Sequence, residues 1–161
     1  MAVEESTPGL EHETDELTGF GTRSVLLRDL EGAVEPGCPP RTLGVLDLHG
    51  FLDRFGRIDA EAHVCSVARH LSAALEGARL YRPREHELAV LVEAPAQEAE
   101  RLLSVAASSV NAQLGQQRVA VVFCLVTLPN EASDPVVALS LAESRHIARR
   151  RPRERRLYPR G

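Results

Sequence analysis

The sequence contains no lysine and no tryptophan, and aromatic residues make up only 4% of its 161 residues. All 19 basic residues are arginines, which is typical of coding bias in a GC-rich bacterial genome, so no lysine amine can form a Schiff base or bind phosphate compactly. With so few rings, we expect a core of Leu, Val and Ala. The 43% apolar and 26% charged residues indicate one globular domain, not a disordered chain.

Cysteine is also scarce, and long apolar runs are missing. Cys38, Cys65 and Cys124 form no Cys-x-x-Cys pair, which disfavours zinc and a disulfide framework and favours a reducing compartment. The longest apolar run, Val119 to Leu128, is shorter than the roughly 20 residues that cross a bilayer. No basic segment with an apolar stretch precedes the domain as a signal peptide would. We therefore expect a cytoplasmic protein with no membrane segment.

The formal charge of −4 is unevenly distributed along the chain. Residues 1–16 hold six acidic side chains and no arginine, whereas residues 145–160 hold eight arginines and one glutamate. We interpret residues 1–14 as an acidic flexible tail, 15–149 as one domain and 150–161 as an Arg-rich tail. The tail arginines can bind an anion such as nucleic acid or polyphosphate, fold back on the acidic tail, or remain solvated. The candidate anion patch comprises Arg149, Arg150, Arg151, Arg153, Arg155 and Arg156.

Hydrophobic periodicity predicts helices that alternate with short buried strands. Helices are expected over residues 23–33, 60–76, 95–114 and 135–149, a short helix or turn over 49–56, strands over 42–48, 78–81, 88–93 and 118–128, and a hairpin turn over 83–87. Ser133-Asp134-Pro135 is a typical start for the last helix. This order predicts the α+β class, an α/β sandwich with a mixed, mainly antiparallel sheet flanked by helices.

Four segments, in this order, resemble the GGDEF (diguanylate cyclase) family. They are Asp15-Glu16-Leu17-Thr18-Gly19-Phe20-Gly21-Thr22-Arg23, similar to the family's Asp-x-Leu-Thr-Gly-Leu-x-Asn-Arg; Asp47-Leu48-His49-Gly50-Phe51, similar to Asp-x-Asp-x-Phe-Lys; Arg84-Glu85-His86-Glu87-Leu88, in the place of the signature turn; and Ala142-Glu143, in the place of the terminal Ala-Asp-x-Ala-Leu-Tyr-x-Ala-Lys helix. The resemblance implies the nucleotidyl-cyclase, ferredoxin-like GGDEF fold. In that family the fold condenses two GTP molecules into cyclic di-GMP across a homodimer.

The signature turn departs from the family's pattern. Its two glycines allow backbone N–H groups to approach a triphosphate, and here they read Arg84 and Glu85. The acidic metal ligand of the turn reads His86, and an imidazole is a poor ligand for Mg²⁺. We therefore expect the remnant turn, Arg84, Glu85, His86, Glu87 and Leu88, to have no catalytic function.

Departures at other positions act on different parts of the chemistry. The family's phosphate-binding lysine reads Leu52, and its guanine-reading asparagine reads Phe55, which cannot supply those hydrogen bonds. The product-inhibition motif Arg-x-x-Asp reads Leu75-Glu76-Gly77-Ala78. These losses fall on phosphate binding, base recognition and feedback, and together with the rewritten turn they argue against turnover.

Some polar groups of the implied site remain. Asp47 and Glu87 are candidate nucleotide-binding residues, and Glu61 can be aligned with the family's guanine-binding aspartate. Asp47 is also the candidate metal ligand, with Mg²⁺ expected only together with residual nucleotide binding and no other cofactor expected. The alternative is that Asp47 and Glu87 are solvated acids at strand ends. His49 and His86 are either a pH-sensitive or metal-binding pair or ordinary surface histidines.

The sequence therefore favours a catalytically inactive GGDEF-like domain that works as a signalling or interaction module in bacterial cyclic-dinucleotide regulation. Its partner would be another protein or a second copy of the chain. One alternative is a sensor that binds GTP or cyclic di-GMP without turnover. The others are a diguanylate cyclase with unusual ligands, and an anion-binding module that works through the Arg-rich tail.

Overall fold

The computed structural model describes residues 13–114 and 121–145. In these ranges five strands form one sheet in the order β1-β3-β4-β2-β5. The strands are β1 (Gly21–Thr22), β2 (Arg41–Asp47), β3 (Arg79–Arg84), β4 (Glu87–Val92) and β5 (Phe123–Leu128). β1 runs parallel to β3, and every other neighbouring pair is antiparallel. The predicted mixed, mainly antiparallel sheet is confirmed.

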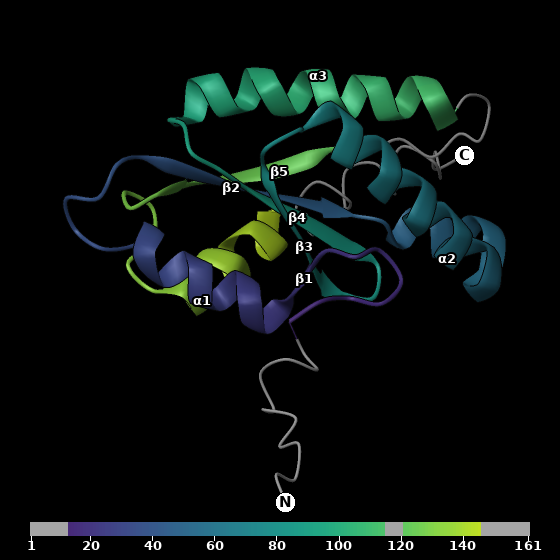
Figure 1. Ribbon diagram of the computed structural model, residues 1–161, viewed down its shortest axis with the longest axis horizontal. Helices are drawn as coiled ribbons and strands as arrows, with labels where there is room; N and C mark the ends of the chain where they lie inside the picture. Colours follow the sequence, from purple (N-terminus) through teal and green to yellow (C-terminus); the bar gives the residue numbers. More distant parts are fainter. Residues whose placement is uncertain (1–12, 115–120, 146–161) are drawn as a thin grey trace, which may run out of the picture.

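Helices cover both faces of this sheet (Figure 1). They are α1 (Arg23–Ala33), α2 (His49–Ala74), α3 (Ala96–Leu114) and a last helical segment, 135–145. α2 and α3 pack on one face, and α1 and the 135–145 segment pack on the other. The last helix begins as predicted, because Asp134 Oδ1 accepts hydrogen bonds from the backbone N–H groups of Val136 and Val137 at 2.8 and 3.2 Å.

Each face of the sheet has its own aliphatic core, because successive side chains of a strand point to opposite faces. Leu46 and Val90 pack under α2 and α3, whereas Val45 and Ala89 pack under α1 and the 135–145 segment. α3 lies close to the sheet at Gly44, where a Cβ would lie 2.7 Å from Leu103 Cδ1. The predicted core of Leu, Val and Ala is confirmed.

Three boundaries differ from the predictions. Residues 49–56 and 60–76 are one kinked helix, α2, in which Gly56 provides the bend with a left-handed φ of 77°. Residues 21–22, for which no strand is predicted, form the short strand β1 because they pair with Tyr81 and Arg82 of β3. Within the described residues β5 begins at Phe123, and residues 121–122 are not in a strand.

Both predicted tails lie wholly or largely outside the described residues, and so does the whole anion patch. Of the acidic tail, Glu13 is described: its carbonyl accepts a hydrogen bond from Thr22 N at 3.2 Å, and its carboxylate bonds Arg28 at 2.9 Å. None of the helices in residues 13–114 and 121–145 has the length and apolarity to span a membrane.

Candidate functional site at the β3–β4 hairpin

The hairpin that carries the remnant turn is tighter than predicted. β3 continues through Pro83 to Arg84, which pairs with Glu87, so only Glu85 and His86 form the turn. Pro83 is accommodated because the register of β3 shifts between Tyr81 and Arg84, and an irregular position needs no N–H for the ladder. The predicted five-residue turn over 83–87 is therefore wrong in length but right in place.

The two acids retained from the family pattern lie side by side. β2 and β4 are antiparallel neighbours, and Asp47 is the register partner of Glu87 at the ends of the two strands. Leu48 N donates to His86 O at 2.7 Å, which holds the turn against the start of α2. The two strand ends that carry the candidate acids thus form one site.

Glu87 is a buried acid in this site, with 5% of its surface exposed. Burial raises the pKa of Glu87 to about 7, and repulsion from Glu143 and Asp47 adds to the rise, although the Arg84 and Arg23 guanidinium groups oppose it. Glu87 Oε1 has no hydrogen-bond partner among the described residues. The interpretation of Glu87 as a solvated strand-end acid is wrong.

Arg84, which stands where the resemblance places a glycine, forms an ion pair with Glu143. Its Nε lies 2.6 Å from Glu143 Oε2, and Arg23 Nη1 lies 3.6 Å from the other oxygen of the same carboxylate. Glu143 comes from the 135–145 segment and Arg23 from the start of α1. Three elements thus converge beside Glu87 and place alternating charges there.

Two of these groups were not among the predicted site residues. Glu143 belongs to the last of the four resembling segments. Arg23 is the final residue of the first one, residues 15–23, which we call the opening segment. The one feature of the sequence that could have pointed to Arg23 and Glu143 is their position in the first and the last of the four resembling segments. Their contacts depend on how α1 and the 135–145 segment dock, which the local sequence does not specify.

The two histidines of this site, His49 and His86, lie together. The rings of His49 and His86 have centroids 5.5 Å apart, and His49 Nδ1 is in hydrogen-bond contact with Asp47 Oδ1. His86 is only 6% exposed, and its Nε2 has no hydrogen-bond partner among the described residues. The alternative that both are surface histidines is therefore wrong for His86.

The arrangement does not fit the magnesium site that the resemblance implies. Mg²⁺ prefers octahedral oxygen ligands, whereas Asp47 Oδ1 is engaged by the backbone N–H and ring of His49, and His86 offers a nitrogen. Across residues 13–114 and 121–145, no group of three or more His, Cys, Asp or Glu side chains is placed to hold a metal ion. Asp47 as a metal ligand stays a prediction that this geometry does not favour.

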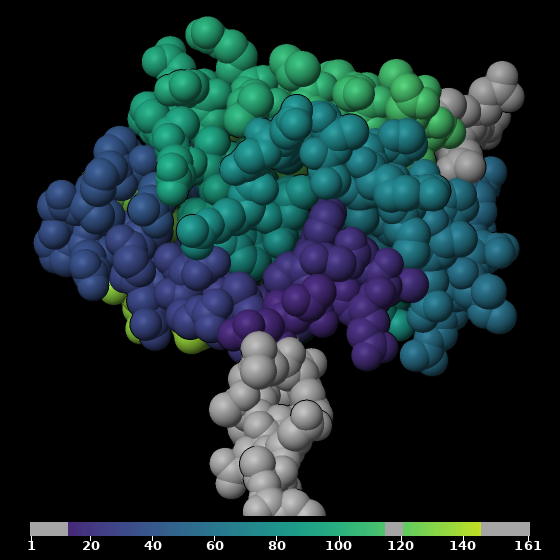
Figure 2. All heavy atoms as spheres, viewed as in Figure 1, coloured from purple at the N-terminus to yellow at the C-terminus, as the bar shows by residue number. Residues whose placement is uncertain are grey.

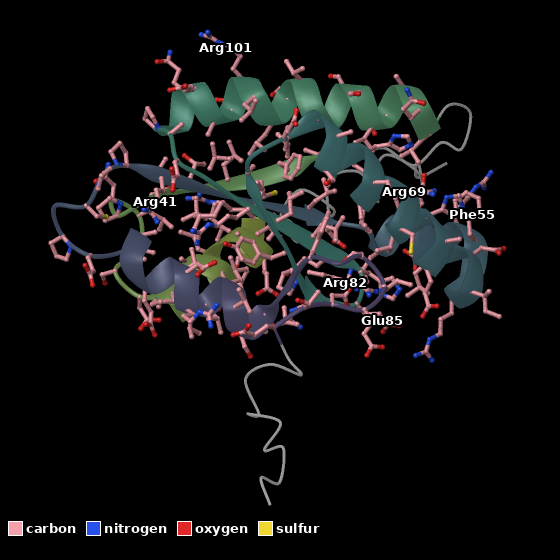
Figure 3. All side chains as sticks on the ribbon, in the orientation of Figure 1. Arg41, Phe55, Arg69, Arg82, Glu85 and Arg101 are labelled. Carbon is pink, nitrogen blue, oxygen red and sulfur yellow. The ribbon has the colours of Figure 1, made fainter. Side chains whose placement is uncertain are left out.

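An inner ion pair holds the hairpin to the opening segment. Arg82 Nη1 lies 3.1 and 3.2 Å from the two carboxylate oxygens of Asp15, and its side chain is only 9% exposed. Arg82 Nη2 also donates to Glu85 O at 2.6 Å. Burial disfavours the ionised Asp15, but hydrogen bonds from Thr18 and the charge of Arg82 lower its pKa overall. Figure 3 shows Arg82 and Glu85 together at this end of the sheet.

The predicted base-reading position on α2 is occupied by stacked rings. Phe55 lies 4.3 Å from His63 between ring centroids, and Phe51 lies 5.2 Å from the same histidine. Gly56, where α2 bends, lies between Phe55 and His63 in the chain. Glu61, the third candidate nucleotide-binding residue, is exposed on α2.

A hollow lies between the opening segment and α2. Its volume is about 540 Å³, and its lining includes Leu17, Thr18, Cys65, Arg69 and Ser72. Figure 2 shows the opening segment in purple against the blue-green surface of α2, and Figure 3 places Arg69 and Phe55 on this side of the molecule. The hollow falls in the range of small-molecule sites.

Comparison with known proteins was informative only at the level of structure. No family model matches the sequence, and the curated proteins gave no match. A structure of the coiled coil and GGDEF domain of DgcB from Caulobacter crescentus, in complex with c-di-GMP, matches with a TM-score of 0.67 at 20% identity, over 88% of this chain and 82% of that one. The FimX GGDEF domain from Pseudomonas aeruginosa matches with a TM-score of 0.64 at 17% identity, over 82% and 90%.

A third similar structure is the diguanylate cyclase SiaD from Pseudomonas aeruginosa in complex with its activator SiaC. It matches with a TM-score of 0.60 at 20% identity, over 84% of this chain but only 60% of that chain. At these identities the likeness establishes the architecture and not the activity. The chain therefore has the fold of a GGDEF domain, the fold that its four resembling segments imply.

Proposed function

We propose that this chain is a GGDEF-like domain that does not condense GTP and that acts in cyclic-dinucleotide regulation by binding a protein partner or a second copy. The observation that carries the proposal is the Arg84–Glu143 ion pair at 2.6 Å, formed at the turn where the family's glycines would admit a triphosphate. The Arg84 side chain, paired with Glu143, occupies the space that a triphosphate would need.

The charges of the site support the same conclusion. Glu85 is an acid where a triphosphate would approach, and two like charges 4 Å apart repel by about 4 kcal/mol at an effective dielectric of 20. Glu143 adds a second carboxylate that is already committed to Arg84 and Arg23. The guanidinium groups of Arg84 and Arg23 are already paired with Glu143, and the chain has no lysine to bind the phosphates instead.

The loss of base recognition is a separate support. Phe55 packs against the rings of His63 and Phe51 at the position of the guanine-reading asparagine, and a phenyl ring has no group that can hydrogen-bond a base edge. A site with neither a metal arrangement nor a base-reading group lacks the positioning that phosphoryl transfer chemistry requires.

The hydrophobic cores on both faces of the sheet are intact although this site has lost its chemistry. This combination favours a domain that acts by binding another molecule through its surface. SiaD, one of the similar structures, is complexed with an activator protein, which makes a protein partner a reasonable candidate here.

Incubation with GTP tests the proposal directly. The purified chain, supplied with GTP and Mg²⁺ or Mn²⁺ at high protein concentration, is expected to leave the GTP peak unchanged in anion-exchange chromatography. The control is Glu87→Gln, which removes the one retained acid of the turn. Cyclic di-GMP that forms with the wild type and vanishes with this variant would overturn the proposal.

A nucleotide sensor is the second candidate. It is favoured by the hollow of about 540 Å³ that Thr18 and Arg69 line, and by the c-di-GMP complexes of the similar DgcB structures. Calorimetry with GTP and with cyclic di-GMP, with and without Mg²⁺, separates the candidates. Binding heat that Arg69→Gln abolishes would establish the sensor, and its absence at millimolar nucleotide would leave the interaction module.

A further inference from the structure

Strand β5 is an edge strand with an unusual composition. It stands last in the strand order, and in the described ranges its ladder partner is β2. Its sequence, Phe-Cys-Leu-Val-Thr-Leu, has no charge and no proline, and it is rich in β-formers. A six-residue strand of this kind, open at an edge, pairs readily with another copy of itself.

The outer edge of β5 is nevertheless covered by side chains. Backbone groups of alternate residues face the same edge, so Leu125 and Thr127 point outward together. Thr127 N donates to Glu131 Oε2 at 2.6 Å, and Thr127 O accepts from Glu131 N at 2.9 Å. Leu125 O accepts a hydrogen bond from Arg145 Nη1. Three backbone groups on the outer edge, Thr127 N, Thr127 O and Leu125 O, are therefore hydrogen-bonded without a further strand.

The two covering residues also hold each other. Arg145 Nη1 lies 3.1 Å from Glu131 Oε2, and Arg145 Nη2 bonds the other oxygen of that carboxylate. Thr127 Oγ1 donates to the same Oε2 at 2.8 Å. Glu131 follows β5 and Arg145 ends the described part of the last helix, so the pair ties this helix to the strand edge. We call Glu131 and Arg145 the edge clamp.

The chemistry of the edge clamp suits capping. The hydrogen bond from Arg145 lowers the pKa of Glu131 to about 2, so its carboxylate remains an acceptor at all ordinary pH values. Glu131 supplies an acceptor for the backbone N–H of Thr127, and Arg145 supplies a donor for the backbone C=O of Leu125. Exchanging the two residues would preserve their mutual attraction but would leave both backbone groups uncapped.

We propose that the edge clamp holds closed a self-association surface, in which β5 of one copy adds antiparallel to β5 of a second copy. A second copy is the fitting occupant because the uncharged strand matches itself in an antiparallel pair about a two-fold axis. The interface would be continuous with the existing sheet. It would form once the side chains of Glu131 and Arg145 move away and the backbone hydrogen bond from Glu131 N to Thr127 O opens.

Sedimentation velocity over a wide range of protein concentration tests this. Glu131→Ala uncaps Thr127 N and frees Arg145, and it is expected to add a concentration-dependent species of twice the mass seen for the wild type. Glu131→Gln keeps an acceptor for Thr127 N and is expected to sediment as the wild type does. Arg28→Gln, which removes a surface ion pair on α1, is the matched control and is expected to change nothing.

The charge exchange Glu131→Arg with Arg145→Glu separates capping from simple helix anchoring. We expect this double variant to associate as Glu131→Ala does, because the restored ion pair cannot cap the strand. Adding Thr127→Arg to Glu131→Ala places a charge on the edge and is expected to abolish the association. If Glu131→Ala does not fold, Arg145→Met, which uncovers only Leu125 O, provides the same comparison.

Any of three results would overturn the proposal. One is a folded Glu131→Ala or Arg145→Met variant, with the circular dichroism spectrum of the wild type, that sediments as the wild type does at every concentration. Another is recovery of wild-type sedimentation by the exchanged pair, which would assign the two residues to anchoring the last helix. Association that persists with Thr127→Arg would equally place the contact away from β5.

Discussion

Replacing Glu87 by glutamine is expected to stabilise the protein at high pH and to change it little at low pH. Glu87 is buried beside Asp47 and Glu143, and its pKa in the folded chain is about 7 against an ordinary value of 4.5. Each pH unit of difference is worth roughly 1.4 kcal/mol, so ionised Glu87 costs the folded state about 3 kcal/mol. Glutamine has nearly the same shape and no charge.

The sign follows from proton binding. Between pH 4.5 and pH 7 the folded chain keeps the Glu87 proton that the unfolded chain has lost, so the contribution of this residue to stability falls as pH rises through that window. Well above pH 7 the stabilising contribution of the Glu87 proton is fully lost. The free energy of unfolding of Glu87→Gln should therefore exceed that of the wild type by up to about 3 kcal/mol at pH 8, and the difference should shrink toward pH 4.

Urea unfolding of both proteins at several pH values measures this difference. The control is Glu85→Gln in the same turn, because Glu85 is about half exposed and its contact with Arg57 is a surface pair. It should change stability by less than about 1 kcal/mol at any pH. A Glu87→Gln variant that is less stable than the wild type at pH 8 would refute the reasoning, since it would mean that ionised Glu87 stabilises the fold.

Further predictions concern the rest of the scaffold. Asp15→Asn leaves the nearly buried Arg82 without its charge partner and should lower the free energy of unfolding by about 2–3 kcal/mol, measured by urea unfolding; a loss as small as that of the exposed-pair variant Arg28→Gln would contradict it. Gly44→Ala places a Cβ 2.7 Å from Leu103 Cδ1 and should destabilise by about 1–3 kcal/mol, whereas Gly32→Ala, with open space on α1, should stabilise by about 0.5–1 kcal/mol. Equal effects of the two alanines in thermal unfolding would show that α3 does not approach β2 as described.

The parts of the fold that local pattern controls were predictable. The apolar runs of β2 and β4 identified both strands, whereas Asp47 and Glu87 stood out only because they occupy acidic positions of the resembling segments. The kink in α2 and the true hairpin were harder to predict. Pro83 argued for a turn, yet it lies in β3 at a position where the strand register shifts.

The rest of the site depends on contacts between segments that are distant in sequence. β1 has only two residues and exists because they pair with Tyr81 and Arg82, so no local period could reveal it. Glu143 and Arg23 meet Arg84 only after α1 and the last helix have docked on the sheet. The edge clamp likewise joins a loop residue to a helix residue across β5. Such pairings are set by tertiary packing and carry no signature in either segment alone.

The absence of GTP condensation is tested most directly by a single-turnover reaction with the chain in excess over labelled GTP and with Mg²⁺ present. Under these conditions slow product release cannot hide a chemical step. The Arg84–Glu143 pair and the glycine-free turn predict that all the label remains GTP. Label found in a linear dinucleotide or in cyclic di-GMP, and lost with Glu87→Gln, would contradict the account.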